Sequence, residues 1–336
     1  MKKTITVAAA GLLSLSLLTG CNNSQTAVTS AQTDSKAEAS IETQESGKGQ
    51  ENGEAGITYP YVYTDASGRE ITIEKQPQAV VTDYLPLWET MLLLDVVPIA
   101  ASGAENYIAT WDAFEGYDLS GVKDLGAKEV NLELLAELEP DMILHQGSDM
   151  TNLDIENLEK IAPVAVFGSD TKMDWRLSLR EVAKVLNKEA KAEEVITQVN
   201  EKLTKSRERL AEKYKGQTVV QFSVMGEDKY FVAYRPDLYD KETGLGLNLP
   251  EGFTKARNYE QISMESIVQM NPDYIFMNVF DGDEALMEAL EQNSVWKSLK
   301  AVQAGHVYRL DGSGHAPSAL ATLYTVDFIT DALTAE

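Results

Sequence analysis

The feature that most constrains the fold of this chain is a 14-residue unit that occurs twice. Residues 131–144 and 263–276 align without a gap. Each copy begins with a residue that favours a helix N-cap, Asn131 or Ser263, and continues with apolar residues at helical spacing. A Pro-Asp pair then ends the helix and leads into an apolar strand. One helix–turn–strand unit in each half of the chain predicts two lobes of related construction.

Strand and helix patterns alternate around both copies. An amphipathic helix is predicted around residues 87–94, and a β-hairpin around the turn-forming Asp-Ala-Ser-Gly sequence at 65–68. Short apolar runs predict buried strands at 79–82, 96–101, 142–144, 164–167 and 218–222. Strands that alternate with helices favour an α/β fold with parallel sheets.

The region 174–214 has a different pattern. Leucine, valine and isoleucine recur at helical spacing among many charged residues, and the region contains no glycine or proline. We predict one long helix here, with Asn187 as the place where it could break. The folded body should therefore consist of a lobe, a long helix and a second lobe.

The N-terminus has the pattern of an export signal. Lys2 and Lys3 precede an apolar run at 5–18, which is shorter than the roughly 20 residues needed to span a bilayer. The run closes with Leu-Thr-Gly before Cys21 and resembles the lipobox of bacterial lipoproteins, in which cleavage precedes a lipidated cysteine. An ordinary signal peptide and a core helix that ends in cysteine are the alternatives. Two acyl chains on Cys21 would suffice for stable anchoring.

The segment 22–56 is rich in serine, threonine, glutamine, glutamate, alanine and glycine and has no aromatic residue. Such a segment buries too little apolar surface to offset the entropy lost on ordering. We therefore predict a disordered tether between the anchor and the folded body.

The composition excludes several classes of function. The 29 Lys and Arg residues against 53 Asp and Glu give a net charge of −24, which is unsuited to nucleic acid. An anionic membrane surface would also repel the chain, so the lipid must do the anchoring. A single cysteine rules out an internal disulfide, and three histidines leave little material for a zinc site. The sequence has no nucleophile elbow, phosphate loop or His-Glu-x-x-His motif, so we expect no catalytic residues, no metal site and no resident cofactor.

In their order along the chain, these features resemble the class III solute-binding proteins of bacterial ABC importers, which collect siderophores, haem or cobalamin. The resemblance runs from about residue 58 to the C-terminus. It is carried by 65–73, the two Glu…Pro-Asp units, the long helix, 246–251 and 296–308. It implies two Rossmann-like α/β lobes with parallel-rich sheets, joined by one rigid helix, and a ligand cleft between the lobes. It also implies a monomeric binding protein, not an enzyme, that serves a permease dimer.

Together with the N-terminal pattern, the resemblance divides the chain into five parts. These are a signal peptide at 1–20, the lipidated cysteine and tether at 21–57, an N-terminal lobe at 58–170, a connecting long helix at 171–215 and a C-terminal lobe at 216–336. We expect the protein on the extracytoplasmic face of the cell membrane of a Gram-positive bacterium, held there through its lipid anchor.

Glu133 and Glu265 occupy matched positions in the first turns of the two repeated helices. The resemblance implies that one such carboxylate per lobe docks against arginines of the permease, which can pair with each carboxylate bidentately. The alternative is that each glutamate only benefits from the helix dipole, an effect of about 0.3–1 kcal/mol.

Candidate ligand contacts are aromatic, histidine and polar residues near predicted strand ends. They are Tyr84, Trp111, His145 and Gln146 in the first lobe, and Tyr234, Arg235, Tyr239, Phe280 and His315 in the second. Tyrosine and tryptophan supply rigid contact area with a polar group, and arginine pairs with the anionic or carbonyl oxygens of a chelate. Core packing is the alternative for each aromatic residue, and a structural role is the alternative for each histidine.

The leading interpretation of function is capture of an iron–siderophore complex. Residues 230–251 and 323–328 resemble the hydroxamate-siderophore receptors of Gram-positive bacteria, although those relatives carry Trp and Arg where this chain has Pro-Asp-Leu-Tyr at 236–239. Haem binding, with a tyrosine or histidine as axial ligand, and cobalamin binding are the alternatives within this class of importer. An anchored enzyme is the alternative from another class.

Overall fold

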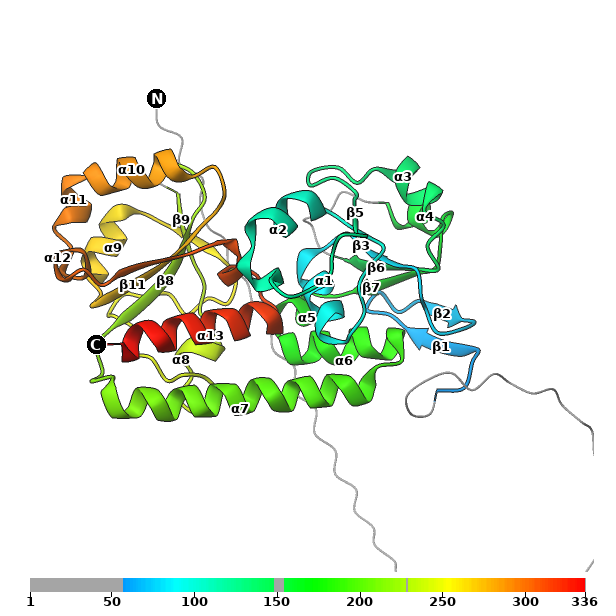
Figure 1. The fold of residues 1–336 in the computed structure, drawn as a ribbon, viewed down its shortest axis with the longest axis horizontal. Coiled ribbons are helices and arrows are strands. Elements are labelled where there is room, and N and C mark those ends of the chain that lie inside the picture. Colours follow the sequence, from blue (N-terminus) through cyan, green and yellow to red (C-terminus); the bar gives the residue numbers. More distant parts are fainter. Residues whose placement is uncertain (1–56, 148–153, 228, 336) are drawn as a thin grey trace, which may run out of the picture. The chain divides into compact units, whose positions relative to one another are not determined.

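The structure is a computed structural model that describes residues 57–147, 154–227 and 229–335. The predicted signal peptide, Cys21 and the predicted tether up to residue 56 lie outside the described residues. Within them, a two-stranded hairpin precedes two five-stranded sheets, each flanked by helices (Figure 1). The predicted two-lobed α/β fold is confirmed.

The hairpin consists of β1 (Tyr61–Thr64) and β2 (Glu70–Ile73), which pair antiparallel as predicted. Its turn is fixed by the buried carboxylate of Asp65, which accepts hydrogen bonds from the backbone N–H groups of Arg69 at 3.0 Å and Val166 at 3.3 Å. The Arg69 guanidinium pairs with the same carboxylate at 2.7 Å. The turn is thereby tied to the first lobe.

The sheet of the first lobe is entirely parallel, with the order β5-β4-β3-β6-β7. Its strands are β3 (Val80–Thr82), β4 (Ala100–Ala101), β5 (Lys123–Asp124), β6 (Met142–Gln146) and β7 (Val164–Phe167). The helices between them are α1 (Leu85–Leu93), α2 (Ala104–Thr110), η1 (Asp112–Phe114), α3 (Leu132–Glu137) and α4 (Ile155–Glu159).

The strand predicted at 96–101 is shorter than expected, because only β4 pairs within the sheet. The Val96 N–H donates to the Met91 carbonyl at the end of α1, at 2.9 Å, and Pro98 has no N–H to donate. The apolar run therefore begins as a helix end and becomes a strand only after the proline.

The connecting segment predicted at 171–215 is not one helix. It consists of α5 (Ser169–Met173), α6 (Trp175–Leu186) and α7 (Glu189–Lys213), the last of which has 25 residues. The break falls at Asn187, which adopts the left-handed conformation with φ 55°. Asparagine tolerates this conformation better than most residues, and α6 ends there.

The sheet of the second lobe has the order β10-β9-β8-β11-β12. Its strands β8, β11 and β12 are parallel to one another, whereas β9 pairs antiparallel with both of its neighbours, β8 and β10. Its strands are β8 (Val219–Val224), β9 (Tyr230–Val232), β10 (Glu260–Ile262), β11 (Tyr274–Val279) and β12 (Val307–Leu310). Its helices are α8 (Pro236–Tyr239), α9 (Met264–Met270), α10 (Glu284–Gln292), α11 (Ser294–Lys297), α12 (Lys300–Ala304), η2 (Gly312–Gly314) and α13 (Ala319–Thr334).

The repeated unit folds alike in both lobes, as α3 followed by β6 and as α9 followed by β11. Asn131 and Ser263 cap these helices as predicted, since their side chains accept hydrogen bonds from backbone N–H groups in the first turn.

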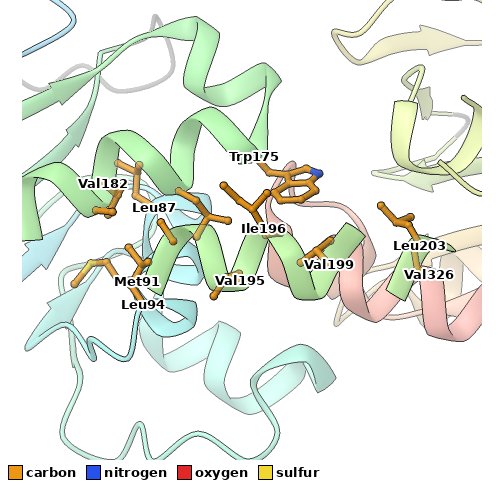
Figure 2. Close-up of a cluster of buried hydrophobic side chains, with 14 of the residues drawn as sticks. Leu87, Met91, Leu94, Trp175, Val182, Val195, Ile196, Val199, Leu203 and Val326 are labelled. Carbon is orange, nitrogen blue, oxygen red and sulfur yellow. The ribbon is translucent and has the colours of Figure 1, made fainter. Parts of the chain in front are cut away.

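A large hydrophobic core joins the lobes through helices (Figure 2). Leu87 and Met91 of α1 pack with Val182 of α6, and further along the same cluster Leu203 of α7 packs near Val326 of α13. Helix α13 runs along α7 and also contacts α1 (Figure 1). The C-terminal helix is therefore a second connection between the lobes, beside the connecting segment.

Candidate functional site

The strand order of the first lobe places two strand ends where a ligand is expected. The chain passes from β3 to β4 on one side and returns as β6 on the other side, so β3 and β6 flank the point at which the order reverses. Ligands of open α/β sheets bind beyond the carboxyl ends of strands at such a point. Asp83 and Tyr84 follow β3, and β6 itself ends with His145 and Gln146.

His145 and Gln146 are buried and are held by the first lobe itself. The His145 ring pairs with the Asp83 carboxylate, and both side chains are almost fully enclosed. The Gln146 side-chain amide donates to the carbonyls of Phe167 and Gly168, each at 2.9 Å. These contacts fix the ends of β3, β6 and β7 relative to one another.

Tyr84 and Glu89 face the second lobe from α1. Tyr84 is the N-cap residue of α1, and its pKa is raised by burial and, further, by the nearby charge of Glu89 and by Tyr259. Glu89 lies one turn further along the helix and has no exposed surface. Burial raises the pKa of Glu89 to about 8, although Ser318 and Arg235 act in the opposite direction.

Arg235 follows β9 and is mostly buried in the second lobe. Its guanidinium pairs with Asp237 at 2.6 Å and donates to the Gly314 carbonyl at 2.6 Å. Burial lowers the pKa of Arg235, but Asp237 and Tyr259 raise it by more, so the pKa lies above its ordinary value. Arg235 is therefore charged, and Asp237 already balances that charge.

His315 completes the site from the segment between η2 and α13. Its ring stacks on Tyr259, with centroids 4.3 Å apart, and meets Phe280 edge-on at 5.3 Å. The Tyr259 hydroxyl donates to the His315 carbonyl. Burial, and then the charge of Arg235, lower the pKa of His315 to about 4, so the ring is neutral at pH 7. Burial raises the pKa of Tyr259 to about 12.

A network of buried hydrogen bonds links His315 to the strands of the second sheet. The side-chain amide of Gln221 donates to Asn278 and to the Gly314 carbonyl, both at 3.2 Å. Asn278 in turn donates to the Ser223 hydroxyl at 3.0 Å, and that hydroxyl is hydrogen-bonded to the His315 ring at 2.8 Å. The carboxyl ends of β8 and β11 are thus linked to His315.

The lobes also touch through two short segments. Trp111 packs so closely on Gly312 that a β-carbon added there would lie 2.5 Å from the indole nitrogen. The Ala113 N–H donates to the Ser313 hydroxyl at 3.0 Å. Glycine at 312 is therefore required by close packing of the two lobes.

The structure brings together five of the nine predicted ligand residues, which are Tyr84, Trp111, Arg235, Phe280 and His315. Tyr234 and Tyr239 pack against each other with ring centroids 5.9 Å apart, and Tyr239 is buried and also packs on Phe253. Contact between any of the nine residues and a ligand stays a prediction.

Three residues of the site were missed from the sequence, namely Glu89, Tyr107 and Tyr259. Tyr107 lies on α2 against Trp111, with ring centroids 4.8 Å apart, and the nearby charge of Glu89 adds to burial in raising its pKa. Glu89 carried a detectable signal, because it is the one charged residue in the apolar run 85–94. Tyr259 carried none, because it lies in a polar loop.

The two glutamates predicted to dock are exposed. Glu133 lies in the first turn of α3, and Glu265 lies in the first turn of α9. A hydrogen bond from Ser263 lowers the pKa of Glu265. Both carboxylates are available to a partner.

Among the residues that the structure describes, no group of three or more histidine, cysteine, aspartate or glutamate side chains has an arrangement that could hold a metal ion. In the same part of the chain, no helix combines the length and the apolar character needed to cross a bilayer.

Comparison with known proteins identifies the family. The model of the periplasmic binding protein family matches residues 88–313. The iron-uptake system-binding protein of Bacillus subtilis is 28% identical over 249 residues, which cover 71% of this chain and 75% of that protein. The iron(3+)-hydroxamate-binding protein FhuD of the same organism is 28% identical over 285 residues, which cover 80% and 85%.

Solved structures share the fold. The triscatecholate siderophore binding protein FeuA of Bacillus subtilis, complexed with ferri-bacillibactin, superposes with a TM-score of 0.65 at 21% identity and covers 82% of this chain and 99% of its own. Staphylococcus aureus SirA, complexed with staphyloferrin B, gives 0.65 at 24% identity and covers 81% and 98%. With the family model matched over more than half of its length, this chain belongs to the periplasmic binding protein family.

Proposed function

We propose that this protein is the substrate-binding component of an ABC importer and captures a ferric siderophore between its two lobes. The observation that carries the proposal is the meeting of two groups at the carboxyl ends of the sheets. Tyr84 and Glu89 come from the first lobe, and Arg235, Tyr259 and His315 from the second. Aromatic faces with a few polar groups are typical of small-molecule sites.

The relatives support the same ligand class. Two of them are named for iron uptake and for binding iron(3+)-hydroxamate, and two of the solved structures contain ferri-bacillibactin or staphyloferrin B. A chelate enclosed between aromatic side chains should quench the fluorescence of a nearby tryptophan, and Trp111 lies within the site.

The test is a fluorescence titration of the full chain, purified in detergent, with ferric siderophores, haem and cobalamin. We expect saturable quenching by at least one ferric siderophore, and none by the iron-free chelator at the same concentration. Binding of haem alone, seen as a haem absorption band, would replace the siderophore with the alternative ligand.

We further propose that Cys21 carries the lipid that holds the protein on the extracytoplasmic face of the membrane. The support is the lipobox-like sequence that ends at Cys21. Cys21→Ala should abolish incorporation of a clickable fatty acid in cells. Undiminished labelling of this variant would show that the lipid is absent from Cys21.

Delivery of the ligand is proposed to depend on Glu133 and Glu265, the exposed carboxylates of the repeated helices. One carboxylate per lobe suits a permease dimer that presents a basic side chain to each lobe.

A further inference from the structure

Glu89 is a buried carboxyl group whose hydrogen-bonding capacity is largely unused within the described part of the chain. Its exposed fraction is 0%, and neither carboxylate oxygen makes a hydrogen bond of good geometry to another described residue. Ser318 is the side chain that interacts with it, because the Ser318 hydroxyl accepts from the Ala321 N–H at 3.0 Å and keeps its own proton to donate toward Glu89. A buried polar group without well-placed partners destabilises a protein, because its lost hydration is not replaced. Such a group at the contact between two lobes is suited to a hydrogen bond with a ligand.

Among the described residues, the groups around Glu89 supply no net positive charge. Arg235 is the cation whose charge acts on Glu89, Tyr259 and His315, and Asp237 lies 2.6 Å from its guanidinium. His315 is neutral at pH 7, since burial lowers its pKa to about 4.

Enclosing a charged ligand without opposite charges is unfavourable. The free-energy cost of removing water from the charge exceeds the stabilisation that contacts with uncharged groups provide. A trianionic chelate would meet one cation that is already balanced, together with an acidic group. An uncharged chelate would instead meet the aromatic faces of Tyr84, Tyr259 and Phe280, and its amide or carbonyl groups could hydrogen-bond to Glu89.

We infer that the site selects a ferric chelate without net negative charge, in which three monoanionic groups balance Fe³⁺, and that Glu89 hydrogen-bonds this chelate. The inference rests on the proposed function and narrows its ligand class.

The first experiment compares three probes by fluorescence titration of the full chain in detergent. They are an uncharged ferric tris-hydroxamate, a trianionic ferric tris-catecholate and ferric citrate. The uncharged probe should bind at least about 100-fold more tightly than either anion, given the several kcal/mol needed to bury an unpaired charge. Equal or tighter binding of the trianion would overturn the charge inference and leave the proposed function intact. Binding of none of the three would overturn the proposed function itself.

The second experiment separates ligand contact from structural support. Glu89→Leu removes the buried polar group and should raise the melting temperature of the ligand-free protein, while weakening the uncharged probe about tenfold or more. Glu89→Gln keeps the shape and hydrogen-bonding capacity and should change affinity by less than about threefold. Glu105→Leu, at an exposed position on α2, is the control and should change neither quantity. A lower melting temperature for Glu89→Leu, or its unchanged affinity, would refute the assignment.

The third experiment alters the charge balance directly. Asp237→Asn keeps the size of the side chain but leaves the charge of Arg235 unbalanced. Affinity for the tris-catecholate should rise about tenfold relative to that for the tris-hydroxamate, because a buried cation gains most from an anion. If the Asp237→Asn variant still melts cooperatively and the ratio of the two affinities is unchanged, Asp237 does not control the charge of the site.

Discussion

The two lobes use the same repeated unit and differ in what surrounds it. In the first lobe, Asp141 accepts a hydrogen bond from the Ala79 N–H at 2.9 Å, just before β3. In the second, the matching Asp273 accepts from the Thr218 N–H at 2.7 Å, just before β8. The aspartate of each Pro-Asp pair therefore ties its own strand to the neighbouring strand. This shared part sets the register of the central strands in both lobes.

The difference lies at the edge of the second sheet. The first sheet is parallel throughout, whereas β9 and β10 extend the second sheet with antiparallel pairing. Arg235 follows β9 and Tyr259 precedes β10, so both residues come from the part that the first lobe lacks. The repeat supplies the scaffold, and the unmatched strands supply the charge and much of the aromatic surface of the site.

Breaking the buried ion pair between Arg235 and Asp237, beside the antiparallel strands of the second lobe, should have the largest effect on stability. Arg235→Ala leaves the carboxylate of Asp237 buried, with an exposed fraction of 8%, and without its cation. We expect a loss of about 3–5 kcal/mol in the free energy of unfolding, measured by urea denaturation.

The double variant Arg235→Ala/Asp237→Ala removes both charges and should recover a substantial part of that loss. Arg180→Ala, which breaks an exposed ion pair with Glu193, is the control and should cost no more than about 1 kcal/mol. A loss for Arg235→Ala as small as that of the control would mean that the buried pair does not stabilise the second lobe.

Variants of the exposed carboxylates of Glu133 and Glu265 should show that both lobes contribute equally to transport. Glu133→Ala and Glu265→Ala should each impair cellular iron uptake and leave ligand affinity unchanged, because both residues lie on the surface. Truncating one partner of an interfacial charge pair costs about 2–5 kcal/mol, so the double variant should lose most uptake.

The matched controls for this prediction are Glu137→Ala and Gln269→Ala, at equivalent exposed positions of α3 and α9. They should leave uptake unchanged. Normal uptake by the double variant Glu133→Ala/Glu265→Ala would leave only the stabilising effect of the helix dipole for these two carboxylates.

Acid should weaken both lobes through hydrogen-bonded aspartates. Burial acts to raise the pKa of Asp65, but hydrogen bonds from Ser67 and Arg69 outweigh it, and the net pKa is lowered. The pKa of Asp273 is lowered in the same way through Thr218 and Lys300. A lowered pKa stabilises the folded state above the unfolded-state value of about 3.9, and this contribution is lost as the pH falls through the folded-state pKa.

Asp65→Ala should therefore reduce stability at pH 7 by about 1–3 kcal/mol, with Asp273→Ala at the low end of this range because its side chain is 32% exposed. Each variant should also flatten the dependence of stability on pH below about pH 5. An unchanged acid profile for Asp65→Ala would contradict the role given to this carboxylate.

The sequence predicted those parts of the fold that depend on local chemistry. The caps at Asn131 and Ser263 and the Pro-Asp ends of the helices require no distant partner, and all are confirmed. The break at Asn187 was anticipated as an option, but its left-handed backbone could not be derived from helical periodicity. The strand at 96–101 was overestimated because periodicity does not register that the Val96 N–H ends a helix.

The site was harder to predict from the sequence than the fold, because its residues come together only in the folded chain. Strand ends pointed to Tyr84 and His315, whose positions follow from the α/β topology. Burial of Glu89 depends on α13, which returns from the far end of the chain to pack on α1. Stacking of Tyr259 on His315 likewise joins residues 56 positions apart.

The smallest expected effects test whether the repeat is energetically symmetric. Asn131 accepts a hydrogen bond from the Leu134 N–H at 3.0 Å, and Ser263 accepts one from the Ser266 N–H at 3.3 Å. Replacing either cap by alanine should cost about 1 kcal/mol, and the two losses should add because the caps lie in different lobes. Exchanging the cap types, as Asn131→Ser and Ser263→Asn, should be nearly neutral, since both residues rank high at N-caps.

The second lobe offers one readout that the first does not. Ser263 lowers the pKa of Glu265 through a hydrogen bond, so Ser263→Ala should raise that pKa toward its ordinary value, as followed by NMR titration of the carboxyl carbon. A loss of stability in one lobe only would show that the repeat is shared in sequence and shape but not in energy. The cap of the unaffected helix would then be dispensable, with packing of that helix against its sheet holding it in place.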